Sequence, residues 1–109
     1  LISSHFIFLF FYMNIVATLV SVAQTSVTVF DSAVTTSRKV VISNNSANPI
    51  TISQVTAVAN TGFIIPANSN ITIDTTGLTA SSGGREYVPT LKAISGTGTN
   101  AVGVAAYTE

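Results

Sequence analysis

The stretch FIFLFFYMNIVATLVSVA, from Phe6 to Ala23, governs how the rest of the chain is interpreted. It is almost entirely apolar, and a helix of this length is long enough to cross a membrane or to fill the middle of a helical bundle. Polar residues recur every three or four positions within it and just after it, at Asn14, Thr18, Ser21 and Thr25. On a helix they would form one narrow stripe. The pattern therefore predicts a hydrophobic α-helix over residues 1–25.

The flanks of this stretch bear on what would cover such a helix. A secretion signal or an oriented membrane anchor normally carries Lys or Arg beside its apolar run, but the first Lys or Arg here is Arg38. The chain opens at Leu1 without a Met, which we interpret as a processed, mature N-terminus. A helix that is apolar nearly all round must be covered by lipid or by protein. We expect this helix to contact membrane lipid before the subunits assemble into a polymer, and to pack against copies of itself afterwards.

Downstream of residue 25 the pattern changes from helical to extended. Runs rich in Val, Ile and Thr alternate with turn-forming clusters of Asn, Gly, Pro and Ser about every 8 to 12 residues, which is typical of an antiparallel Greek-key sandwich. We expect about seven strands, near residues 27–30, 38–43, 50–58 with a bulge near Gln54, 63–65, 71–75, 87–93 and 101–107. The predicted fold is thus α+β, with a long N-terminal hydrophobic helix over residues 1–25 and a small Ig-like β-sandwich domain over residues 26–109.

Composition argues against several classes of function. Charged residues make up 7% of the chain and the formal net charge is zero, so neither nucleic acid nor an anionic membrane surface is an expected partner. The chain has no Cys, which excludes disulfides, thiolate metal sites and cysteine nucleophiles. Its one histidine and its acidic residues show no spacing that would pair them: His5, Asp31, Asp74, Glu86 and Glu109. We therefore expect no enzyme activity, no metal site and no cofactor.

Two segments match the N-x-Ser/Thr pattern for N-glycosylation. They are Asn44-Asn45-Ser46 and Asn70-Ile71-Thr72. Single matches arise by chance in a chain this rich in Asn, Ser and Thr, but together with the low charge they favour an extracellular location. Asn44 and Asn70 are therefore candidates for attached glycans.

The order of these features resembles archaeal type IV pilins and their flagellin relatives. The resemblance covers the whole chain, which opens into a hydrophobic segment and continues into a β-rich domain with the sequences VVISNNSANPITIS, GFIIPANSNITIDTTGL and GGREYVPTLKAISGTG. It implies a secreted subunit, trimmed by a prepilin peptidase, whose helices bundle into the core of a filament. The β-domains would then cover the outside of that filament.

The resemblance also implies which residues would form the assembly core. They are Phe6, Phe10, Met13, Asn14, Val16, Ala17, Thr18, Leu19 and Ser21. The expected product is a homopolymer, an extracellular filament on the cell surface, with adhesion as its role. Two alternatives stay open at this point: a membrane-anchored cell-surface β-domain that acts as an adhesin, and a viral surface protein.

Overall fold

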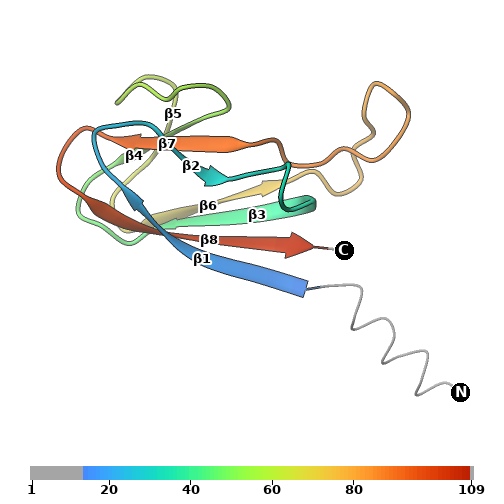
Figure 1. The fold of residues 1–109 in the computed structure, drawn as a ribbon, viewed down its shortest axis with the longest axis horizontal. Coiled ribbons are helices and arrows are strands. Elements are labelled where there is room, and N and C mark those ends of the chain that lie inside the picture. Colours follow the sequence, from blue (N-terminus) through green and yellow to red (C-terminus); the bar gives the residue numbers. More distant parts are fainter. Residues whose placement is uncertain (1–13, 109) are drawn as a thin grey trace, which may run out of the picture.

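The computed structural model of the chain describes residues 14–108, which form two four-stranded antiparallel sheets stacked on each other (Figure 1). The strands are β1 (Asn14–Val22), β2 (Val27–Phe30), β3 (Ser37–Asn44), β4 (Ile50–Ser53), β5 (Phe63–Ile65), β6 (Ser69–Asp74), β7 (Leu91–Ser95) and β8 (Asn100–Thr108). One sheet has the order β1-β8-β3-β6 and the other has the order β2-β7-β4-β5. Within residues 14–108, no helix is long and apolar enough to span a membrane.

The predicted N-terminal helix is wrong where the structure describes it. Residues 14–22 form β1, which pairs antiparallel with β8 from Asn14 opposite Thr108 to Val22 opposite Asn100. The described chain is therefore all-β rather than α+β. The rest of the predicted helix, residues 1–13, lies outside the described residues.

The physical reason for this error lies in the side chains of β1. Five of its nine residues are β-branched, namely Ile15, Val16, Thr18, Val20 and Val22. Branching at Cβ restricts χ1 in a helix and favours a pleated strand. Periodicity alone cannot separate a buried helix from a strand in a short apolar run, and the full-length pairing with β8 decides between them.

The core lies between the two sheets. Its fully buried members come from alternate positions of strands in both layers, as the period of two in a strand requires: Val22, Val40, Ile42 and Val102 from one sheet, and Ile50, Ile65 and Ala93 from the other. Val22 belongs to β1, so β1 is part of this core although it precedes the expected domain boundary at residue 25.

Two further strands differ from the prediction. β7 begins only at Leu91, because Pro89 has no N–H to donate to a ladder. Residues 54–58 do not continue β4, and Val58 forms only an isolated bridge with Thr61. The tight turn between Val58 and Thr61 includes Asn60, whose φ is 60°.

Candidate functional site

β1 is an edge strand. β8 flanks it on one side, and on its other side no strand of the described chain is paired with it (Figure 1). Edge strands are commonly protected by charged residues, by proline or by being short. β1 has none of these protections, because its nine residues read NIVATLVSV. Its free edge is therefore open to pairing with another strand.

Backbone hydrogen bonds show which groups of β1 point to this open edge. The Ile15 N–H donates to the Asn14 side chain at 3.0 Å, and the carbonyl of its row partner Tyr107 accepts from Ser37 Oγ at 2.8 Å, toward β3. Because alternate residues of a strand turn their N–H and C=O groups to opposite edges, Ala17 and Leu19 also direct these groups outward.

β1 carries exposed apolar side chains on both faces. Ile15 and Leu19, which point away from the second sheet, are 54% and 75% exposed, and Val16 on the opposite face is still 40% exposed. Val22, at the far end of the strand, is completely buried. On the inward face Asn14, Val16 and Thr18 are all exposed, so the second sheet does not cover this part of β1.

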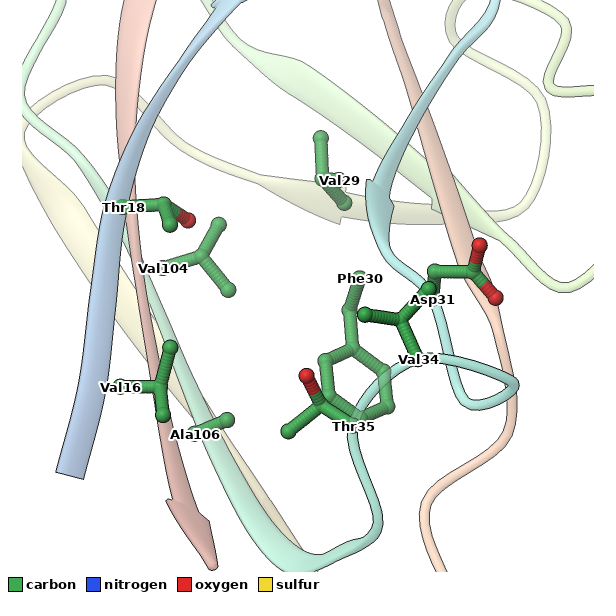
Figure 2. Close-up of a pocket in the computed structure, with 9 residues that line it drawn as sticks. All are labelled: Val16, Thr18, Val29, Phe30, Asp31, Val34, Thr35, Val104 and Ala106. Atoms are coloured by element: carbon green, nitrogen blue, oxygen red, sulfur yellow. The ribbon is translucent and has the colours of Figure 1, made fainter. Parts of the chain in front are cut away.

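An open pocket of about 190 Å³ lies beside the inward face of β1 (Figure 2). Val16 and Thr18 of β1 lie on one side of it, and Phe30 and Val34 lie across from them. The lining is completed by neighbours on β8, β2 and the loop after β2: Val104, Ala106, Val29, Asp31 and Thr35. The polar side chains of the lining are one carboxylate, Asp31, and two hydroxyls, Thr18 and Thr35, and the other six are apolar. The pocket suits apolar side chains.

The loop on the far side of this pocket is held by its own hydrogen bonds. The Asp31 carbonyl accepts from the N–H groups of Val34 and Thr35 at 3.1 and 3.0 Å, and Ser32 Oγ lies 2.9 Å from Thr90 Oγ1. Val34 at its tip is 81% exposed. The pocket therefore has an ordered, apolar wall opposite β1.

The other edge of the same sheet is β6, and it has a comparable apolar pocket. Ile71 and Ile73 of β6 line an opening of about 210 Å³ together with Ile52, Ser53, Gln54, Phe63 and Leu91. Phe63 is 58% exposed there. Asp74 ends the strand, and hydrogen bonds from Thr76 lower the pKa of its carboxyl, with smaller contributions from Lys39 and Arg38. β6 thus combines an apolar inward face with one ionised end.

The predicted assembly-core residues are only partly brought together. Six of them lie on β1, where all are exposed: Asn14, Val16, Ala17, Thr18, Leu19 and Ser21. A strand divides them between two faces, so they do not form the single stripe expected of a helix. Phe6, Phe10 and Met13 lie outside the described residues.

The two predicted glycosylation positions have opposite environments. Asn44 is fully buried, and its Nδ2 donates to the carbonyl groups of Asn48, Ile65 and Pro66 at 2.8, 3.2 and 3.1 Å. A glycan on that nitrogen would displace these bonds. Asn70 lies on the exposed face of β6, where a sugar would meet solvent. Glycosylation of Asn70 stays a prediction.

Asn44 belongs to a polar network that no motif in the sequence indicates. Its Oδ1 accepts from the N–H and the hydroxyl of Ser46. Asn48 Nδ2 donates to Asn100 Oδ1 at 3.0 Å, and Asn100 Nδ2 in turn lies 3.3 Å from the Val22 carbonyl. The network links β3, β8 and the end of β1. The cluster of Asn and Ser at residues 44–48 is typical of a turn, and it contains no further signal for this network.

Among residues 14–108, no group of three His, Asp or Glu side chains is placed to hold a metal ion. The functional interpretation rests on the open edge of β1 and on the two apolar pockets at the edges of its sheet. Comparisons with protein-family models, with curated proteins and with solved structures found no match to this chain.

Proposed function

We propose that this protein is a structural subunit of an extracellular filament and that copies of it associate through β1. One observation carries the proposal: the nine-residue open edge of β1, uncharged and with exposed apolar side chains on both faces. Apolar surface removed from water contributes about 25 cal/mol per Å². A second protein surface that covered Ile15, Val16 and Leu19 would gain this energy together with backbone hydrogen bonds.

The alternative of a membrane anchor fits this fold less well. A helix that spans the hydrocarbon core needs about 20 consecutive apolar residues. The apolar run Phe6–Ala23 contributes its second half to β1, where residues 14–22 are paired with β8. The pairing of those nine residues in the sheet favours a contact with protein over a membrane-spanning helix through them. An exposed apolar edge is better explained by contact with protein.

Negative-stain electron microscopy and sedimentation of the purified chain test the proposal. We expect thin, uniform filaments without detergent. Leu19→Asp and Val16→Asp should each abolish assembly, because either substitution places an unpaired charge in the interface. Leu78→Asp is the matched control, since Leu78 is 55% exposed in the loop after β6, and this variant should assemble normally.

Circular dichroism establishes that the three variants are folded before they are compared. Detergent-dependent single particles from the wild-type chain would contradict the proposal. Filaments of normal appearance from Leu19→Asp and Val16→Asp would show that β1 is not where copies meet.

A further inference from the structure

The two open edges of the β1-β8-β3-β6 sheet are related in direction. Every neighbouring pair in this sheet is antiparallel, so β1 and β6 at its opposite edges run in opposite directions. A second copy placed beside the first in the same orientation would therefore bring its β1 antiparallel to β6. The sheet would then continue from one copy into the next with every neighbouring pair of strands antiparallel.

The two edges also cover the same six rows of the sheet. One row contains Ile15, Tyr107, Lys39 and Asp74, and the row at the other limit contains Val20, Val102, Asn44 and Ser69. Residues 15–20 of β1 thus lie level with the whole of β6, residues 69–74. A copy displaced sideways, without sliding along the strands, would match them one to one.

The free backbone groups of the two edges fall in the same rows. Ile15, Ala17 and Leu19 direct theirs outward from β1, as described above. On β6, the Thr75 N–H donates toward β3, to the Arg38 carbonyl at 2.7 Å. Alternation then turns the groups of Asp74, Thr72 and Asn70 outward. These three residues share rows with Ile15, Ala17 and Leu19, so donors and acceptors would meet in pairs.

On the inner face of the sheet the side chains of the two edges match as well, whereas on the outer face Ile15 and Leu19 share rows with the polar residues Asp74 and Asn70. Val16 shares a row with Ile73, and Thr18 shares a row with Ile71. These four side chains all point to the inner side of the sheet. Val16 and Thr18 line one of the two open apolar pockets, and Ile71 and Ile73 line the other. Side by side, they would extend the core from one copy into the next.

From these matches we infer that β1 of one copy adds to β6 of the next, with residues 15–20 opposite residues 69–74. The inference rests on the proposed function and identifies the partner as a second copy of this chain. Because the contact joins two different edges, it is heterologous, and a heterologous contact whose rotation does not close a ring repeats from copy to copy and builds a filament. Symmetric pairing of β1 with β1 would give a closed dimer and would leave Ile71, Ile73 and Phe63 uncovered.

Cross-linking of introduced cysteines tests this interface directly, because the chain has no Cys. Ala17 and Thr72 share a row on the outer face. In the inferred contact their Cα atoms would be about 5.5 Å apart. Within one chain, three strand spacings separate them by about 14 Å. A short thiol-specific cross-linker can therefore join these positions only between copies.

Chains with Ala17→Cys and chains with Thr72→Cys are mixed, allowed to assemble and treated with the cross-linker. We expect heterodimers on a denaturing gel, and a ladder of covalent multimers from the double variant. The control mixture replaces Thr72→Cys by Thr79→Cys, an exposed position in the loop after β6. Its heterodimer yield should be about tenfold lower, since no contact brings Thr79 near Ala17 in the inferred pairing.

Microscopy of the same samples distinguishes the filament proposal from the inferred contact between β1 and β6. Filaments together with Ala17–Thr72 heterodimers support both the filament and the contact. Filaments without that cross-link, or with Ala17→Cys homodimers in its place, overturn the inferred interface and leave the filament proposal standing. Absence of both filaments and cross-links overturns both.

Discussion

At the scale of single residues, the clearest division of roles is between the two sequons. Both match the same acceptor pattern, but Asn44 is a buried structural residue and Asn70 is exposed on an edge strand. The pattern N-x-Ser/Thr contains no information on burial, so the sequence could not distinguish them. What separates them is the environment: three carbonyl groups surround the Asn44 amide.

Asn44→Asp tests the structural role of this residue. The substitution keeps the shape of the side chain but turns a donor into a carboxylate that faces three carbonyl oxygens. At pH 7 we expect the free energy of unfolding to fall by about 3 kcal/mol. The folded state would raise the pKa of the new carboxyl, so the loss should shrink as the pH is lowered and that carboxyl becomes protonated.

Urea denaturation followed by circular dichroism measures this effect. Asn45→Asp is the control, because Asn45 is the exposed neighbour of Asn44, and its effect should be within about 0.5 kcal/mol. Equal losses from the two substitutions would show that the Asn44 network does not hold the end of the sandwich together.

At the scale of elements, short strands could be predicted where β-branched residues lie between turn signals. The strands expected at residues 27–30 and 63–65 coincide with β2 and β5, and the strand expected at 50–58 coincides with β4 only over residues 50–53. The strand expected at 87–93 starts late because Pro89 interrupts the ladder. The helix assigned to residues 1–25 was wrong because an apolar run contains no signal of its partner. Only pairing with β8, at the far end of the chain, makes residues 14–22 a strand.

Two proline substitutions separate the open edge of β1 from its paired edge. Ala17→Pro removes an N–H that points to the open edge and changes little apolar surface, so the chain should stay folded but lose assembly. Thr18→Pro removes an N–H from the ladder with β8 and should lower Tm by about 5 °C or more. Thermal unfolding and sedimentation measure the two effects. Normal assembly of Ala17→Pro would argue against backbone pairing at this edge.

At the scale of the whole molecule, the sequence pattern predicts a subunit that assembles into a polymer. The same pattern predicts that an N-terminal helix forms the assembly surface. The structure relocates six of those residues to the edge of a sandwich. Composition thus points to a stretch that the structure places on an exposed edge strand, and the role of that strand in assembly stays a prediction. The relative positions of the two edges could not be predicted from the sequence. Residues of β1 and β6 share rows of the sheet only because of how β8 and β3, which lie between them, are paired.

Amide hydrogen exchange of β1, measured residue by residue in dispersed and assembled protein, tests the central claim most directly. The N–H groups of Val16 and Thr18, directed to β8, should be protected in both states. Those of Ala17 and Leu19, directed to the open edge, should exchange rapidly in the dispersed chain and become protected on assembly. Rapid exchange at Ala17 and Leu19 in the assembled state would contradict the claim that another copy pairs with β1.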